Sequence, residues 1–180
     1  MNKVSALAML AALAALAGCG GEEKAKAPAA AAREMTAGQW QSTLAVTSFR
    51  QTDRAPTPLL NMPVGTRAEG AACIGEGETR RPPPQLFVGR DFENCVWGDN
   101  FYLGNGRLNA PMTCQRDGVG EVEVTVNVAF TGDSYQGTVD MLTRLTAEGD
   151  VLLSARAEGR RTGAQCAPEG EAGNNQAATK

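Results

Sequence analysis

The chain has 180 residues, a formal net charge of −3 and no histidine. The absence of histidine excludes Ser-His-Asp and Cys-His catalysis and most metal chemistry, so we expect no catalytic residue, no metal site and no cofactor. A mildly acidic chain without a dense basic stripe is also a poor candidate for binding nucleic acid, and we interpret the pairs Arg80–Arg81 and Arg160–Arg161 as solvated surface.

Residues 1–18 have the pattern of a secretory signal peptide. Lys3 provides a positive start, and residues 4–16 form an apolar run of 13 residues. A helix that spans a bilayer needs roughly 20 apolar residues, so this run is too short to cross one. A charged start, a short apolar middle and small residues at the end are typical of an export signal that is later removed.

The export signal ends at Cys19. Residues 16–19, Leu-Ala-Gly-Cys, resemble the lipobox of bacterial lipoprotein precursors. The resemblance implies that the Cys19 thiol takes a diacylglyceryl group, that the bond before it is cut, and that the new amino terminus is acylated, as with palmitate. Two or more acyl chains anchor a protein stably, so the membrane is a predicted partner. The residue after the cysteine is Gly20. In the best-known sorting rule, Asp at this position favours the inner membrane, so the resemblance implies the outer membrane. The alternative is a plain export signal with Cys19 as an ordinary thiol.

Segments of low complexity flank the central part of the chain. Residues 20–33 contain no aromatic or β-branched side chain, and residues 167–180 are rich in Ala, Gly, Glu and Asn. Such segments cannot bury enough apolar surface to offset the entropy of ordering. We therefore predict a lipidated, disordered tether at 19–34, with a short Ala-rich helix as the alternative, one β-domain at 35–166 and a disordered tail at 167–180.

The first part of the domain contains two predicted strands and a proline-rich segment. Trp40, Leu44 and Val46 fall on one face of a strand, and residues 65–73 form a weaker strand. Pro82–Pro84 forbid a regular strand and leave room for a short helical turn at 85–87. We interpret the prolines as a rigid loop, with a polyproline recognition segment as the alternative.

Asn105–Gly106, between two leucines, is the strongest short hairpin signal in the chain. The two-residue turn places Trp97 opposite Cys114, with Cys95 one diagonal step away on the same face. A slip or bulge near Gly98 would bring Cys95 and Cys114 within the range that a disulfide allows.

Two further hairpins are expected downstream. The apolar residues of 122–130 alternate strictly, and Gly132–Asp133 form a two-residue turn of the kind that prefers Gly first. This register pairs Phe130 with Tyr135, Val126 with Val139 and Val124 with Met141. A three-residue loop at 148–150 would then place Leu145 opposite Leu153, Thr143 opposite Ala155 and Met141 opposite Ala157.

Four cysteines remain once Cys19 is assigned to lipid: Cys73, Cys95, Cys114 and Cys166. An even number in an oxidising compartment predicts two disulfides. Zinc is the alternative, but the four are widely spaced and include no CxxC pair. Four cysteines allow three connectivities; the hairpin register favours Cys95 with Cys114, which leaves Cys73 with Cys166 by elimination.

These elements predict a mainly β fold, a single small antiparallel β-meander that forms a curved sheet or half-barrel, with a short helical turn and two disulfides. The domain also contains a series of short motifs: GQW at 38–40, Cys73, ENC at 93–95, MTC at 112–114, GDSYQG at 132–137 and RAEGRRTGAQC at 156–166. In these motifs the chain resembles the small exported bacterial proteins of domain of unknown function family 3617. The triple proline departs from the expected pattern. Since the family has no established activity, the resemblance implies the disulfide-bonded β-domain and no chemistry.

Two groups of carboxylates need an interpretation: Asp91, Glu93 and Asp99, and Glu121 with Glu123. The second group alternates with valines, so we expect it to face solvent. The first could bind calcium, but it lacks the spacing of an EF-hand. We assign neither group a function.

The sequence therefore leaves classes of function rather than one activity. We expect an envelope lipoprotein on the outer membrane, facing the periplasm, that is no enzyme and acts as a non-catalytic binding or structural module for an envelope protein. The alternatives are a half-barrel that binds a small apolar ligand and, by analogy alone, an inhibitor of a cell-wall enzyme. Protein binding predicts an exposed aromatic patch, and ligand binding predicts a closed cavity lined by residues such as Trp40, Trp97, Phe101 and Tyr135. With nine aromatic residues in the chain, we interpret these four as core.

Overall fold

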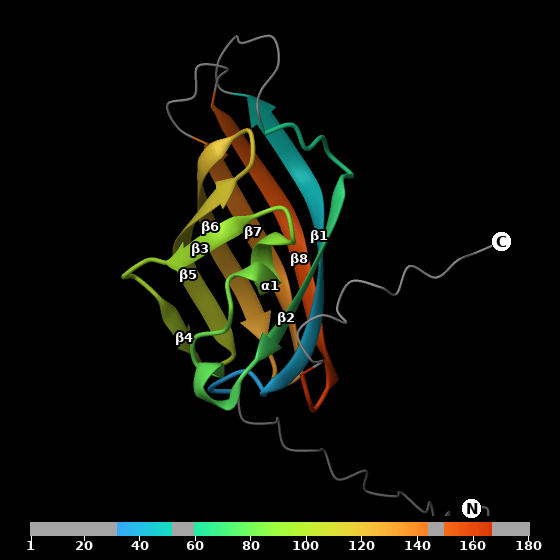
Figure 1. Cartoon of the computed structure of the whole chain (residues 1–180), viewed down its shortest axis with the longest axis vertical. Coiled ribbons are helices and arrows are strands. Elements are labelled where there is room, and N and C mark those ends of the chain that lie inside the picture. The colour runs from blue at the N-terminus through green and yellow to red at the C-terminus, as the bar shows by residue number, and fades with distance from the viewer. Residues whose placement is uncertain (1–31, 52–59, 144–149, 167–180) are drawn as a thin grey trace, which may run out of the picture.

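The computed structural model describes residues 32–51, 60–143 and 150–166. They form one eight-stranded antiparallel sheet in the order β2-β1-β8-β7-β6-β5-β3, and β4 also pairs with β5. The sheet curls into a half-barrel around the helical turn α1 (Figure 1), which confirms the predicted fold class. The elements are β1 (Gly38–Gln51), β2 (Arg67–Ile74), η1 (Glu76–Glu78), α1 (Gln85–Val88), β3 (Glu93–Trp97), β4 (Tyr102–Gly104), β5 (Arg107–Arg116), β6 (Gly120–Phe130), β7 (Ser134–Thr143) and β8 (Val151–Gly163).

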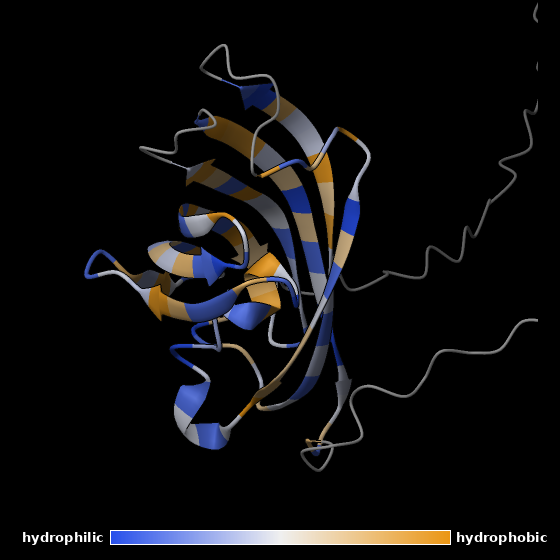
Figure 2. Cartoon of the chain, turned by 45° about the horizontal axis from the view of Figure 1, so that its top comes forward, coloured by the Kyte–Doolittle hydropathy of each residue, from blue (hydrophilic) through white to orange (hydrophobic). Residues whose placement is uncertain are grey.

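Alternation of apolar and polar residues gives every long strand an inner and an outer face. In β6 the inner residues from Val122 to Phe130 are at most 5% exposed, and most residues between them are exposed. Figure 2 shows this alternation as bands of opposite hydropathy along the strands. In β8 the inner positions carry the small residues Ala155, Ala157 and Gly159. Small side chains here leave space inside the curl for a segment that is not part of the sheet.

The hairpin between β4 and β5 forms at Asn105–Gly106, as predicted. Both turn residues have positive φ, 51° and 71°, which is the conformation of a type I′ turn. The predicted pair of Trp97 with Cys114 is wrong, because Trp97 pairs with Met112. The register slips by two residues between β4 and β3, around Gly98, where a slip was expected. As a result Cys95 stands across from Cys114.

The hairpin between β6 and β7 has the predicted register, including Phe130 with Tyr135 and Val126 with Val139. The reason given for Gly132 is wrong, however, because Gly132 is not among the residues with positive φ. A Cβ on Gly132 would lie 2.8 Å from the Thr36 hydroxyl oxygen. A side chain at this position would therefore press on Thr36 in the segment before β1.

The predicted register between β7 and β8 is wrong. Met141 pairs with Leu153 rather than Ala157, and Val139 rather than Thr143 pairs with Ala155. The displacement of four residues is even, so both registers keep the same side chains on the inner face. Hydrophobic alternation could therefore not distinguish them. The third predicted pair involves Leu145, which lies outside the described residues.

A strap of residues 75–92 crosses the opening of the half-barrel from β2 to β3. It contains η1, the three prolines and α1, which begins after Pro84 and ends at Gly89, where φ is 87°. The α1 residues Leu86, Phe87 and Val88 are at most 1% exposed. The strap thus fills the concave side of the sheet, and the predicted helical turn at 85–87 is its centre.

The segment before β1 closes one end of the half-barrel. The amide of Gly106 donates to the Ala32 carbonyl at 2.6 Å, and the amide of Thr36 donates to the Gly132 carbonyl at 2.8 Å. Met35 lies between these contacts and is fully buried. The chain therefore enters the domain at the end where the β4–β5 and β6–β7 turns lie.

Two disulfides bracket the strap. Cys73, just before it, is bonded to Cys166, and Cys95, just after it, is bonded to Cys114. Their Cα atoms are 5.4 Å and 4.0 Å apart. Both ends of the strap are thus covalently tied to other parts of the domain, one to the segment just after β8 and the other to β5.

Candidate functional site

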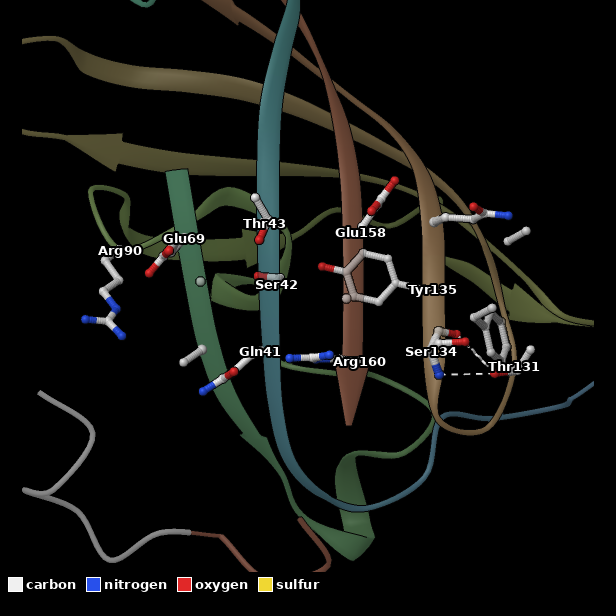
Figure 3. Close-up of a pocket in the computed structure, with 16 residues that line it drawn as sticks. Gln41, Ser42, Thr43, Glu69, Arg90, Thr131, Ser134, Tyr135, Glu158 and Arg160 are labelled. Carbon is white, nitrogen blue, oxygen red and sulfur yellow. Dashed lines mark hydrogen bonds between the residues drawn. The ribbon is translucent and has the colours of Figure 1, made fainter. Parts of the chain in front are cut away.

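A row of four residues on the inner face docks the strap. Tyr135, Gly159, Ser42 and Gly70 are neighbours in register across β7, β8, β1 and β2. The Tyr135 ring packs over Gly159, where any Cβ would overlap it, and its hydroxyl points toward Ser42 (Figure 3). A Cβ on Gly70 would overlap the Ser42 hydroxyl and lie 3.0 Å from the Gln85 carbonyl oxygen. The two glycines therefore let α1 lie directly on the sheet.

Hydrogen bonds fix the strap in this position. The Tyr135 hydroxyl donates to the Leu86 carbonyl at 2.7 Å, and the Trp97 indole donates to the Pro82 carbonyl at 2.8 Å. Burial raises the pKa of the Tyr135 phenol, and the neighbouring Ser42 hydroxyl offsets only part of that effect. Tyr135 is thus a protonated donor over the whole physiological range. Within the described residues the Ser42 hydroxyl has no partner in hydrogen-bond geometry.

The aromatic residues considered as cavity lining form one chain of ring contacts. Ring centroids are 6.4 Å apart for Trp40 and Tyr135, and 5.1 Å apart for Trp97 and Phe101. Phe87 joins the two pairs, 4.9 Å from Tyr135 and 5.6 Å from Trp97. Trp40, Tyr135 and Trp97 are at most 7% exposed. These three are core residues. Phe87, which joins them, was not identified from the sequence, because Phe87 lies in a proline-rich segment with no hydrophobic periodicity.

A hollow of about 820 Å³ lies on the outer face of the same strands; we call it the transverse groove. It crosses β2, β1, β8 and β7 and reaches the end of β6 (Figure 3). Two rows of outward side chains line it in register. One row is Glu69, Thr43, Glu158 and Gln136; the other is Ala71, Gln41, Arg160 and Ser134.

The charged residues of the transverse groove are largely unpaired. Figure 3 shows Arg90, from the end of the strap, beside Glu69 at one end of the groove. Among the described residues, neither Arg90, Arg160 nor Glu69 has an ion pair or side-chain hydrogen bond. Glu158 differs, since it accepts a hydrogen bond from Arg156 at 2.7 Å. Three charged groups are thus available to a ligand.

A second hollow, of about 370 Å³, continues from the groove around the free edge of β2. Arg90 and Glu69 line both. At its far side the Arg116 guanidinium lies 5.2 Å from the centroid of the Phe92 ring and 3.0 Å from the Met62 sulfur. These contacts hold Arg116 at the edge of the half-barrel.

The two arginine pairs divide between surface and structure. Arg80 and Arg160 are exposed, as the solvated interpretation predicted. Arg81 donates to the Trp97 carbonyl at 3.3 Å and lies over the Phe101 ring. Arg161 donates to the Ala37 carbonyl at 2.7 Å and lies 3.6 Å from Asp133. Arg81 is nevertheless exposed, so the solvated interpretation holds for it as well; it was wrong only for Arg161, which is partly buried.

The carboxylate groups singled out in the sequence lie at the surface. Glu121 and Glu123 are exposed on the outer face of β6, and Glu93 and Asp99 are also exposed. Asp91 is 3.9 Å from Arg116. Within the described ranges, no three His, Cys, Asp or Glu residues come together in a way that could hold a metal ion.

Comparison with known proteins gives a family. The model of the family described as "Protein of unknown function (DUF3617)" matches residues 35–166. The chain belongs to this family. No curated protein and no solved structure matches the chain. The DUF3617 match covers all ten elements and both disulfides, so the half-barrel, the strap and the transverse groove belong to the matched region.

The predicted anchor is not part of this region. Cys19 lies outside the described residues. The described part of the chain contains no helix that is long and apolar enough to cross a membrane.

Proposed function

We propose that this DUF3617 protein is a non-catalytic binding module of the cell envelope, held at the outer membrane and facing the periplasm through acyl chains on Cys19. Its binding surface is the transverse groove. The observation that carries the proposal is the position of the groove. It lies within a few residues of the end at which residues 32–36 enter the half-barrel.

The length of the tether supports a site close to the membrane. Thirteen residue steps separate Cys19 from Ala32. At about 3.3–3.6 Å per residue they reach at most about 47 Å. A ligand in the groove would thus be held within tens of ångströms of the lipid.

The interior offers less support for binding. Phe87 and its neighbours in α1 occupy the concave side, and a small apolar ligand there would have to displace them. The proposal of a non-catalytic role draws on the lack of histidine and on the four disulfide-bonded cysteines, which leave no thiolate nucleophile in the described domain. The groove combines charge, amides and hydroxyls and suits recognition of a polar ligand.

The anchor is tested by metabolic labelling with palmitate and by membrane fractionation. We expect the natural chain to incorporate label and to sediment with the outer membrane. Cys19→Ser should lose the label and appear in the soluble periplasmic fraction. An unlabelled natural chain, or a labelled Cys19→Ser variant, would refute the lipid anchor.

The groove is tested by a photo-crosslinking amino acid placed at Gln136, which lines it, or at Thr125, which is exposed on the outer face of β6 away from it. Irradiation of cells should give an adduct from position 136 and none from position 125. Equal adducts from both positions, or none from 136, would contradict binding in the groove.

A further inference from the structure

The transverse groove is elongated and runs across the strands. Its lining comes from β2, β1, β8, β7 and the end of β6, which are neighbours in the sheet. Strands lie about 4.8 Å apart, so four intervals give a length of about 19 Å. An extended peptide advances about 3.3–3.6 Å per residue, so the groove accommodates roughly five or six residues. A linear ligand fits this shape better than a compact one.

The groove carries charges of both signs, with Arg90 beside Glu69 at one end. Arg90 and Arg160 supply two guanidinium groups, and Glu69 and Glu158 supply two carboxylates. Glu158 is engaged by Arg156, which leaves Glu69 as the carboxylate without an ion pair among the described residues. A polyanion or a polycation would meet a like charge along the groove. A ligand with one positive and one negative group would not, so complementarity favours a zwitterion.

The register sets the spacing of the free charges. Arg160 pairs with Gln41, and Glu69 pairs with Thr43, so the two charged residues are two strands and one two-residue step apart. With strands about 4.8 Å apart and a rise of about 3.4 Å per residue, their Cα atoms are about 12 Å apart. This distance corresponds to three or four residues of extended peptide at about 3.3–3.6 Å each.

The groove offers hydrogen bonds rather than aromatic stacking. The two aromatic residues among its lining, Phe130 and Tyr135, are 5% and 3% exposed and face the core. Among the described residues that line the groove, no ring is therefore available for the face of a sugar. The exposed amides of Gln41 and Gln136 and the hydroxyl of Thr43 can bond the peptide groups of a ligand. These donors and acceptors favour a peptide over a saccharide.

We propose that the transverse groove binds an extended peptide that carries both charges, its carboxylate on Arg160 and its ammonium on Glu69. The inference rests on the proposed function and names the class of ligand. The Cα spacing of Arg160 and Glu69 matches the distance between the termini of an extended peptide of about four residues.

The test uses the full processed chain in a non-ionic detergent and a tetrapeptide of alanine and serine with free termini. Amide chemical shifts in a titration locate the site and give the Kd. We expect shifts along the groove, and we expect amidation of the carboxyl terminus to weaken binding about 1.5- to 5-fold, as for one exposed ion pair. Arg160→Gln should cause the same loss with the free peptide and no further loss with the amidated one. Arg50→Gln, on an exposed residue of β1 outside the groove, is the matched control.

Acetylation of the amino terminus of the peptide should also weaken binding. Glu69→Gln should cause the same loss with the free peptide and no further loss with the acetylated one. Equal affinity of free and blocked peptides, shifts on another face, or no binding at millimolar concentration would overturn the proposal. Shifts in the groove with an N-acetylated disaccharide but not with the peptide would overturn it in favour of a saccharide. Because the crosslink from position 136 does not depend on the ligand class, its persistence would show that only this inference had failed.

Discussion

Adjacent residues on the same strands, one on the inner face and one on the outer face, lie in sharply different surroundings. The inner row Tyr135, Gly159, Ser42 and Gly70 is covered by the strap, whereas the next residues along the strands, Ser134, Arg160, Gln41 and Ala71, line an open groove. The inner row combines small residues with one buried phenol, and the outer row carries amides and a guanidinium. The comparison teaches that stability and recognition are separable here. Changes in the inner row should lower the stability of the domain, and changes in the outer row should alter binding.

The two disulfides extend this comparison and give the largest expected effect. Cys73 lies on the outer side of β2, whereas Cys114 faces the core and is fully buried. Loop closure predicts a loss of unfolding free energy of about 4.5 kcal/mol for Cys73→Ala with Cys166→Ala, and about 3 kcal/mol for Cys95→Ala with Cys114→Ala. The difference arises because the first bond closes 93 residues and the second only 19.

Guanidinium denaturation of the two double variants measures both losses. If the Cys95–Cys114 variant is the less stable, the packing of the buried Cys114 outweighs the entropy of the longer loop. That outcome would break the expected order and shift the main stabilising role to the inner face.

Gly159→Ala should have the next largest effect. An added Cβ would overlap the Tyr135 ring, which must then move and weaken its hold on the strap. Overpacking of this kind costs about 1–3 kcal/mol. Gly163→Ala, on the same strand, is the control, because its Cβ would meet its nearest neighbour at an ordinary 3.5 Å. Its effect should stay within about 0.5 kcal/mol by thermal unfolding. Equal losses in both variants would contradict the docking role of Gly159.

Much of the fold follows from local patterns, and the exceptions have physical causes. Alternation in 122–130 predicted a strand and its register with β7, and the Asn105–Gly106 turn predicted its hairpin, because burial of one face and positive φ act locally. The β7–β8 register was missed because an even slip keeps Met141 on the same face. The role of Phe87 was missed because a proline-rich strap has no period. The groove was missed because outward residues such as Gln41 and Glu69 resemble any solvated face until strand pairing brings them together.

The pH dependence of stability provides the smallest and most specific test of the inner row. Burial raises the pKa of Tyr135 in the folded chain above its ordinary value of about 10. The unfolded chain therefore loses this proton first as pH rises, and the stabilisation that is complete below about pH 10 declines above it.

Tyr135→Phe should lower the unfolding free energy by about 1 kcal/mol at neutral pH, because the bond to the Leu86 carbonyl is lost, and should reduce the decline at alkaline pH. Tyr102→Phe is the matched control, since Tyr102 is 49% exposed. Unfolding free energies measured between pH 7 and about pH 11 should separate the two variants. If Tyr102→Phe reduces the alkaline decline in unfolding free energy and Tyr135→Phe does not, the Tyr135 phenol is not the group responsible for that decline.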